Sequence, residues 1–200
     1  MLDREVCQRF AAKLVRLHQP PQSPGEPLRR PDLGTLARLR RGLGKAFGED
    51  GPRDGWVLWT LDACRGPNKA ERFCYTDTDL DWACCVASLF APHRGPSHDR
   101  FAAALRCLWK EQDEAPTVAR RFGVLVESDS RDLPTHLRHA VSLLKAQEIG
   151  FDWANLLFDL TRWNDPDRRV QRRWSRDFWT EPRAKHPAGQ QPTTAPAASE

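Results

Sequence analysis

The sequence predicts an all-α protein of about nine helices arranged in two small helical bundles. Apolar residues recur with a helical period along nearly every segment, and no stretch shows the sustained alternation of a half-buried strand. Residues that commonly cap helices precede several of these segments, and Gly or Pro follows them. Since 40% of the 200 residues are hydrophobic, the chain can form a packed core.

Three helices are expected in the first third of the chain. The first runs from about Asp3 to His18 and ends before a Pro-rich surface loop over residues 20–31. Asp32 is the expected N-cap of the second helix, which carries a stripe of leucines and is closed by a turn near Gly48. A short third helix is expected over residues 56–64.

The middle of the chain predicts two more helices. Asp77 or Thr78 is expected to cap a helix that stops at Pro92, and Ser97 is expected to cap the next one. Four helices follow the break at Pro116. They are expected over residues 117–127, 132–147, 152–163 and 166–179.

Aspartates precede three of these last four helices. Asp132, Asp152 and Asp165 are each a plausible N-cap, because a short carboxylate accepts the free backbone N–H groups of a first turn. Pro166 then occupies the first helical position, where its fixed φ suits a helix and its missing N–H costs no hydrogen bond. The start of the last helix is therefore expected at Pro166.

The loop over residues 91–96 or the break at Pro116 would divide the helices into two bundles, and the second position is the one expected. We expect an N-terminal helical bundle over residues 1–115 and a C-terminal helical bundle over residues 116–180. Residues 181–200 are mainly Pro, Ala, Gln, Thr and Ser, which cannot bury enough apolar surface to offset the entropy of ordering. The sequence therefore predicts a disordered tail there.

Apolar and cysteine patterns indicate a cytoplasmic protein. No apolar run approaches the roughly 18 residues that span a bilayer, and the N-terminus lacks the apolar core of a signal peptide. The six cysteines include no Cys-x-x-Cys pair, and they are expected to be reduced, buried thiols. We expect no membrane partner.

Arginine dominates the positive charge of this chain. Among 31 basic residues, 25 are Arg, and the formal net charge is +4. The planar guanidinium group suits phosphate in partly desolvated settings, although a genome rich in G and C would also encode Arg in place of Lys. The positions of the arginines must therefore decide their role.

The last predicted helix separates arginines from apolar residues. At about 100° per residue, Val170, Trp174 and Phe178 share one side and five arginines share the other. Such a basic face can follow successive phosphates, whereas a solvated surface is the ordinary alternative. The five candidates for nucleic-acid binding on this helix are Arg168, Arg169, Arg172, Arg173 and Arg176.

The second predicted helix carries a smaller basic stripe. Arg38, Arg41 and Lys45 lie opposite its leucines, while Arg40 borders the apolar seam and is the more structural of two adjacent arginines. Basic pairs recur on later helices and are expected to converge in space. The further candidates for nucleic-acid binding are Arg40, Arg41, Arg120, Arg121 and Arg138, and Arg131 forms a basic pair with Arg138.

The sequence offers little support for a metal site, a catalytic site or a base-stacking site. Asp77, Asp79 and Asp81 imitate a calcium loop that lacks its required Gly and Glu, and the cysteines match no common zinc spacing. The His98-Asp99 dipeptide is typical of metal-dependent HD phosphohydrolases. Most of the eight tryptophans are expected to pack in the core, and none is assigned as a base-stacking platform. We therefore expect no enzyme, metal, cofactor or small-molecule substrate.

Three stretches together resemble a known family. They are Leu39-Arg40-Arg41-Gly42, the run from Leu137-Arg138 through Leu143-Leu144 to Ile149-Gly150-Phe151-Asp152-Trp153, and Trp163 followed by Arg172-Arg173-Trp174-Ser175-Arg176-Asp177-Phe178. From about Val6 to Trp179 the chain resembles the CasB family, the small subunit of the type I-E CRISPR Cascade surveillance complex.

The resemblance implies a two-lobed helical protein without catalytic activity. It would be present as two copies, lie along the backbone and large subunits beside the crRNA, and stabilise the R-loop by contacting the backbone of the opened target DNA. The motifs carry this role to Arg41, Arg121, Arg138 and the Arg172, Arg173 and Arg176 group. A stand-alone helical DNA-binding regulator, an HD-type nuclease and a purely structural scaffold remain the alternatives.

Overall fold

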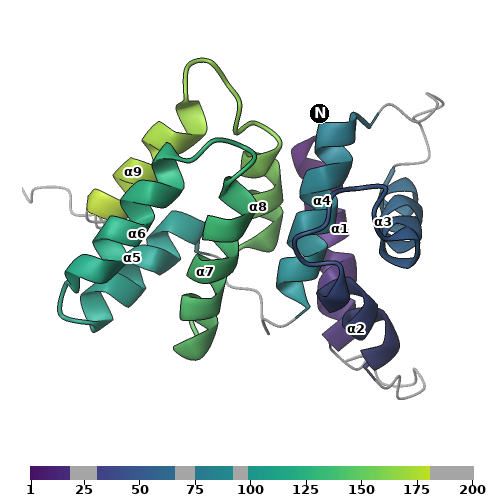
Figure 1. The fold of residues 1–200 in the computed structure, drawn as a ribbon, viewed down its shortest axis with the longest axis horizontal. Coiled ribbons are helices and arrows are strands. Elements are labelled where there is room, and N and C mark those ends of the chain that lie inside the picture. Colours follow the sequence, from purple (N-terminus) through teal and green to yellow (C-terminus); the bar gives the residue numbers. More distant parts are fainter. Residues whose placement is uncertain (19–30, 66–74, 92–98, 181–200) are drawn as a thin grey trace, which may run out of the picture.

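The computed structural model describes residues 1–18, 31–65, 75–91 and 99–180, and these residues form nine α-helices and no strand (Figure 1). The predicted all-α class is therefore confirmed. The helices are α1 (Arg4–His18), α2 (Leu33–Arg41), α3 (Gly51–Ala63), α4 (Asp77–Phe90), α5 (Phe101–Glu111), α6 (Pro116–Glu127), α7 (Leu133–Ala146), α8 (Trp153–Leu160) and α9 (Arg169–Trp179).

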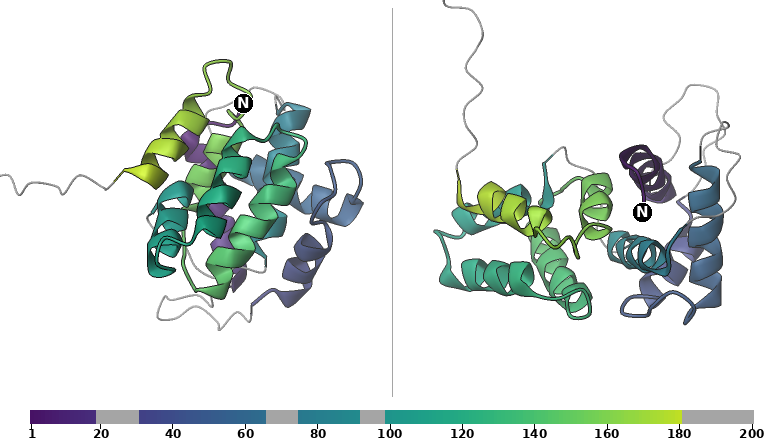
Figure 2. Two further views of the ribbon diagram at one scale, coloured as in Figure 1. Left: turned by 60° about the vertical axis from the view of Figure 1, so that its left-hand side comes forward. Right: turned by 90° about the horizontal axis from the view of Figure 1, so that it is seen from above.

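The helices lie in two groups that share one core. Helices α1–α4 lie on one side of the molecule and α5–α9 on the other, and α8 packs against both α1 and α4 (Figures 1 and 2). The expected domain boundary at residues 115 and 116 would separate α5 from α6 and α9, against which α5 packs. We therefore propose a boundary between α4 and α5.

Aromatic rings fill the core where the two groups meet. Phe90 of α4 meets Trp153 of α8 edge to face across the two groups, with ring centroids 5.3 Å apart. Within the second group, the ring centroid of Phe101 of α5 lies 5.1 Å from that of Trp174 of α9. Because these rings are almost fully buried, they contribute a large share of the hydrophobic stabilisation. The tryptophans that were expected to pack do so: Trp82, Trp153, Trp163 and Trp174 are buried and Trp109 packs against the core.

Two of the expected helix caps are confirmed. The Asp32 carboxylate accepts the backbone N–H of Thr35 at 2.9 Å, and Asp152 accepts that of Asn155 at 3.0 Å. The Asp132 carboxylate, in contrast, makes no capping bond. α7 therefore begins without the expected side-chain cap.

The start of α4 differs from the expectation that Asp77 or Thr78 is the cap. Thr76 accepts the backbone N–H of Asp79, whose carboxylate in turn accepts the backbone N–H of Thr76, so that the two residues form a capping box. Asp81, the acid that a cap at Thr78 would need, is instead bonded to the loop between α2 and α3.

The last helix begins later than predicted. Pro166 lies in a turn before α9, and Asp165 accepts the backbone N–H of Asp167 at 3.0 Å instead of capping a helix. Arg168 follows with a φ of 49°, a left-handed conformation that interrupts any helix running from Pro166. The helix starts at Arg169, because the turn that Asp165 stabilises and the left-handed Arg168 keep residues 166–168 out of the helix.

The region between α2 and α3 also differs from the prediction. α2 ends at Arg41, and α3 already begins at Gly51, where Asp50 is the N-cap and Pro52 occupies the first turn. The predicted surface loop over residues 20–30, the predicted cap Ser97 and the predicted disordered tail lie outside the described residues. No described helix combines the length and apolar character needed to cross a membrane.

Candidate nucleic-acid interface

Helix α9 presents a short line of exposed arginines. Arg169, Arg172 and Arg176 point to solvent, while Val170 and Trp174 are buried on the opposite side. Arg172 and Arg176 have no ion-pair partner within the described parts of the chain, so both guanidinium groups are available to an external anion. Spaced one helical turn apart, they can meet neighbouring phosphates of one strand.

Arg173 has a structural partner inside the molecule. Its guanidinium forms an ion pair with the carboxylate of Asp159 on α8, and Trp174 Nε1 donates to the same carboxylate at 2.7 Å. Burial raises the pKa of the Asp159 carboxyl, while the bonds from Trp174 and Arg173 act in the opposite direction. Arg173 therefore compensates a buried acid rather than extending the exposed line.

Two further arginines of the predicted face are also engaged by the protein. Arg168 precedes the helix, and its Nη2 donates to the backbone carbonyl of Val126 at 3.0 Å. Arg169 contacts the carboxylates of Asp165 and Asp167 at 3.6 Å and 2.6 Å. The predicted face of five arginines is thus reduced to Arg172 and Arg176, with Arg169 partly neutralised beside them.

A cavity of about 420 Å³ lies between the two groups of helices. Arg131 and Arg138 line it from the α7 side and Lys45 from the loop after α2, so packing brings together cations that are far apart in the sequence. The lining residues are Leu43, Gly44, Lys45, Ala46, Thr78, Asp81, Trp82, Cys85, Ser130, Arg131, Pro134, Thr135, Arg138, His139 and Asn164.

The electrostatics of this inter-lobe cavity favour an anion. Among the described lining residues only Asp81 is acidic, and the Asp81 Oδ1 already accepts the backbone N–H of Phe47 at 2.8 Å. Arg131 and Arg138 have no ion-pair partner among the described residues, whereas Lys45 lies 3.2 Å from Asp50. Hydroxyl groups of the lining add donors of the kind that contact phosphate oxygens.

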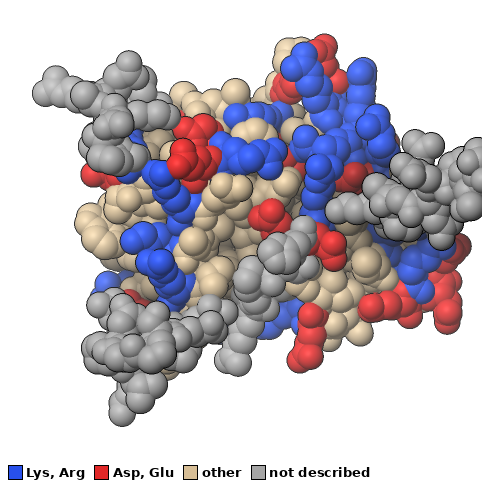
Figure 3. Space-filling view, turned by 180° about the vertical axis from the view of Figure 1, so that it is seen from behind, with Lys and Arg blue, Asp and Glu red and all other residues tan. Residues whose placement is uncertain are grey.

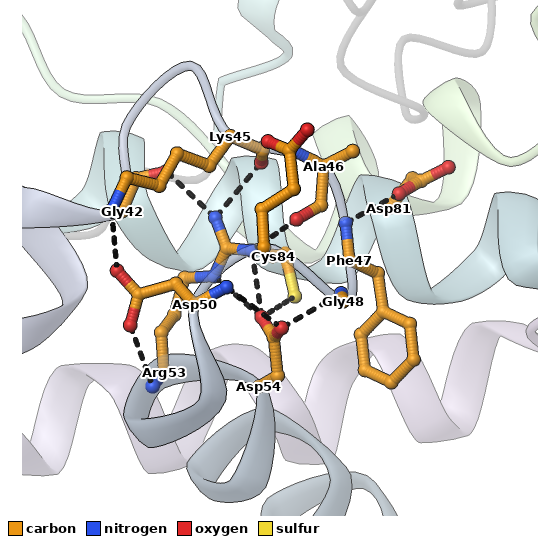
Figure 4. Close-up of polar contacts among 11 residues, drawn as sticks. Gly42, Lys45, Ala46, Phe47, Gly48, Asp50, Arg53, Asp54, Asp81 and Cys84 are labelled. Carbon is orange, nitrogen blue, oxygen red and sulfur yellow. Dashed lines mark hydrogen bonds and ion pairs between the residues drawn. The ribbon is translucent and has the colours of Figure 1, made fainter.

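A buried arginine holds the loop that carries Lys45 (Figure 4). Arg53 has 0% exposure, and its Nη1 donates to the carbonyls of Gly42 at 2.6 Å and Lys45 at 2.9 Å. Its Nη2 donates to the carbonyl of Ala46 and to Asp54, each at 2.6 Å. Five guanidinium donors in one plane can satisfy these acceptors together, which explains the use of Arg here.

Gly42, the last residue of the Leu39–Gly42 stretch, must be a glycine because Arg53 packs directly against it. A Cβ atom at Gly42 would lie 2.4 Å from Cδ of Arg53, although the φ of Gly42 is an ordinary −77°. Sequence reasoning missed Arg53, because an Arg-Asp pair between two glycines shows no helical or metal-binding pattern. The Leu39–Gly42 stretch was recognised as part of the family resemblance, and its glycine lies directly against Arg53.

The arginines of α2 lie close to this loop and are exposed. Arg38, Arg40 and Arg41 are all exposed, so Arg40, which was expected to border the apolar seam, also reaches solvent. The seam is short, because only Leu36 and Leu39 of this helix are buried and the helix stops at Arg41. Lys45, expected on the same helical stripe, lies in the loop beyond the helix.

The remaining candidates occupy a third location. Arg120 and Arg121 are exposed on α6 and line a separate cavity between α6 and α7. In Figure 2, α9 and α1 lie on one side of the molecule and α7 and α2 on the other. The ten predicted arginines therefore do not form one continuous surface.

Sequence reasoning also missed the cations of α1. Seen from behind (Figure 3), Lys and Arg side chains gather over α9 at the upper right, and others follow α1 on the left. Arg9, Lys13 and Arg16 recur at helical spacing opposite the buried face of α1, which is the signal that could have revealed them. Arg9 is partly engaged, since it donates to the carbonyl of Cys64 at 3.0 Å.

No group of three or more His, Cys, Asp or Glu side chains in the described residues is placed to hold a metal ion. His98 of the HD dipeptide lies outside the described residues. Cys7, Cys64 and Cys84 are buried as expected, whereas Cys107 is exposed.

Comparison with known proteins identifies the relatives of this chain. The CRISPR-associated protein Cse2 of Thermus thermophilus is 39% identical over 94 residues, which cover 47% of this chain and 53% of that protein, or about half its length. The crystal structure of CasB from M. ruber has 26% identity and a TM-score of 0.64, covering 90% of this chain and 94% of that one. A chain of a CRISPR RNA-guided surveillance complex has the same fold at 18% identity, with a TM-score of 0.66 over 88% of this chain and 92% of that one.

The family model of the CRISPR-associated protein Cse2 matches residues 35–179, which include all helices from the exposed arginines of α2 to the end of α9. The chain therefore belongs to the Cse2 family of CRISPR-associated proteins, which is also called CasB.

Proposed function

We propose that the chain is the non-catalytic small subunit of a type I-E CRISPR Cascade surveillance complex and binds nucleic-acid backbone during crRNA-guided target recognition. The observation that carries the proposal is the exposed pair Arg172 and Arg176 on α9, which lacks any ion-pair partner among the described residues. Membership in the Cse2 family and the fold shared with a chain of a surveillance complex support it.

The outer face of α9 suits phosphate rather than base edges. Gln171 is the only amide side chain of α9, and it is buried, donating to the carbonyl of Trp163 at 2.8 Å. A helix that reads a mixed sequence in the major groove also needs exposed Asn or Gln side chains, whose amides bind adenine. The arrangement therefore favours sequence-independent backbone contact over the stand-alone DNA-binding regulator.

Backbone contact would help the complex to keep the target DNA open. The duplex between RNA and DNA is about as stable as the DNA duplex that it replaces, so modest contacts to an opened strand tip the exchange. We assign this R-loop stabilisation to Arg172 and Arg176, with Arg138 and Arg131 of the inter-lobe cavity as a second contact region. Two copies of the subunit in one complex would provide such contacts along a longer strand.

The test is R-loop formation by the reconstituted complex with this subunit present, absent, or carrying Arg172→Ala and Arg176→Ala. Loss of two phosphate contacts should weaken target DNA binding roughly tenfold while the variant still assembles. Lys145→Ala on α7 is the matched control, because Lys145 is an exposed cation that lines neither cavity.

The assay shows whether α9 or another surface of the molecule binds the target DNA. Full target binding by the double variant would show that α9 does not contact nucleic acid, and the same exchange at Arg131 and Arg138 would then test the inter-lobe cavity. Native mass spectrometry of the assembled complex counts the copies of the subunit. A single copy per complex would contradict the proposal that two copies are present.

A further inference from the structure

Helices α6 and α7 enclose a second cavity of about 470 Å³ that the proposed nucleic-acid contacts do not use. Its floor is apolar, formed mainly by Leu105 of α5, Phe122 and Leu125 of α6 and Leu143 of α7. Val124 lies at its α6 side with 46% of its surface exposed, although most apolar residues of this helix are buried. An apolar hollow with a few polar groups at its border is the usual form of a binding groove.

The groove is bordered by nitrogen-bearing side chains, and the described residues place no carboxylate in it. Arg120 and Arg121 contribute from α6 and His136 and His139 from α7, and no Asp or Glu is among its lining residues. Arg120 and Arg121 have no ion-pair partner among the described residues. An occupant that carries carboxylates around an apolar side chain would complement both the floor and the border.

We infer that the α6–α7 groove docks a protein segment in which acidic residues flank a large apolar anchor such as Leu, Met or Phe. The inference rests on the proposed function, since the segment would belong to another subunit of the surveillance complex. The cavity volume matches a few side chains rather than a whole helix, so the contact would be a short loop or one helical turn.

The surface is poorly suited to a nucleic acid. Single-stranded bases stack on exposed aromatic faces, but the only aromatic carbocycle in the lining, Phe122, is 3% exposed. Its ring is stacked on Phe178 at a centroid distance of 4.0 Å, so one face is covered, and the 3% exposure of the side chain leaves almost no surface for a base. A phosphate backbone would contact the arginines and leave the apolar floor and Val124 in water.

A photo-crosslinking amino acid at Val124 tests the inference directly. The full chain with benzophenone-alanine at this exposed position is assembled with the other subunits, guide RNA and target DNA, and then irradiated. The expected result is a covalent adduct to another protein subunit. Mass spectrometry should map the adduct to a segment in which Asp or Glu flanks an apolar residue.

The other outcomes overturn the inference in distinguishable ways. An adduct to DNA or RNA would assign the groove to nucleic acid, and the absence of an adduct in assembled complexes would show that the groove is open. Elution of the unmodified subunit apart from the complex would contradict the proposed function and, with it, this inference. A normal R-loop without any protein adduct would overturn the inference while leaving the proposed function intact.

Charge reversal provides an independent readout. Arg120→Glu with Arg121→Glu should weaken association with the complex about tenfold, because carboxylates would then face the acidic segment. Lys145→Glu reverses a cation on the neighbouring helix outside the groove and should leave association unchanged. Equal association of the two variants would contradict the inference, provided that circular dichroism shows both to be folded.

Discussion

Arginines of this chain have opposite roles at the level of single residues. Arg53 is fully buried and bonded to three backbone carbonyls and Asp54, whereas Arg172 is exposed and has no ion-pair partner among the described residues. The guanidinium group suits both environments, because it presents five donors in a plane and keeps its charge. Residue type alone therefore does not separate a structural arginine from a binding one.

The close approach of Arg53 predicts the effect of a methyl group at Gly42. Gly42→Ala should destabilise the protein by about 1–3 kcal/mol, because the new Cβ would overlap Arg53 and displace the loop that it holds. Gly55→Ala is the matched control, since a Cβ there meets nothing within 4 Å and should stabilise α3 by about 0.5–1 kcal/mol. Urea unfolding followed by circular dichroism measures both, and equal stabilities would contradict the packing argument.

Burial also predicts which thiols react. Burial raises the pKa of Cys7, Cys84 and Cys85 to about 12. These thiols stay protonated at pH 8, and only the thiolate is a good nucleophile. Iodoacetamide should therefore modify the exposed Cys107 before any of them in the folded protein, as peptide mapping by mass spectrometry would show. Early modification of Cys84 would contradict the buried position next to Asp54.

Helix α9 combines a structural and a binding role at the level of one element. Its inner side packs Trp174 and Phe178, its flank ties Arg173 to Asp159, and its outer line carries Arg172 and Arg176. The sequence predicted the apolar side correctly, because a period of 3.6 residues determines which positions face the core. The period could not show that Asp159 on α8 would form an ion pair with Arg173.

Adjacent arginines on α9 should therefore respond differently to the same substitution. Arg173→Ala should destabilise the protein by about 2–3 kcal/mol, because it leaves the buried Asp159 without its charged partner. Arg172→Ala should change stability by less than about 0.5 kcal/mol, as expected for an exposed side chain. Thermal and urea unfolding of the two variants would reveal this contrast.

The same pair distinguishes the two roles in binding. Arg172→Ala should weaken binding of single-stranded DNA without loss of helical signal, whereas any binding loss of Arg173→Ala should follow its loss of fold. A stable Arg173→Ala variant with weakened DNA binding would place Arg173 on nucleic acid after all. Its bond to Asp159 would then be secondary.

At the scale of the whole molecule, sequence patterns predicted local structure but not tertiary packing. Helical periodicity and capping residues predicted the class and most elements, since both are local properties of the chain. The start of α9 was missed at Pro166, because competing turn bonds of Asp165 and a left-handed Arg168 decide it. The meeting of Lys45 with Arg131 across the inter-lobe cavity depends on tertiary packing, which no local pattern encodes.

Binding by several basic surfaces predicts a steep dependence on salt for the molecule as a whole. For single-stranded DNA, the logarithm of the binding constant should fall with the logarithm of salt concentration by about 0.7 for each phosphate neutralised. Removing both Arg172 and Arg176 by alanine substitution should therefore reduce the magnitude of this slope by about 1.4, with little change between oligonucleotides of different sequence. Fluorescence anisotropy across a series of KCl concentrations measures the slope. An unchanged slope in the double variant, or strong selection among sequences, would show that the affinity comes from other contacts than phosphates on α9.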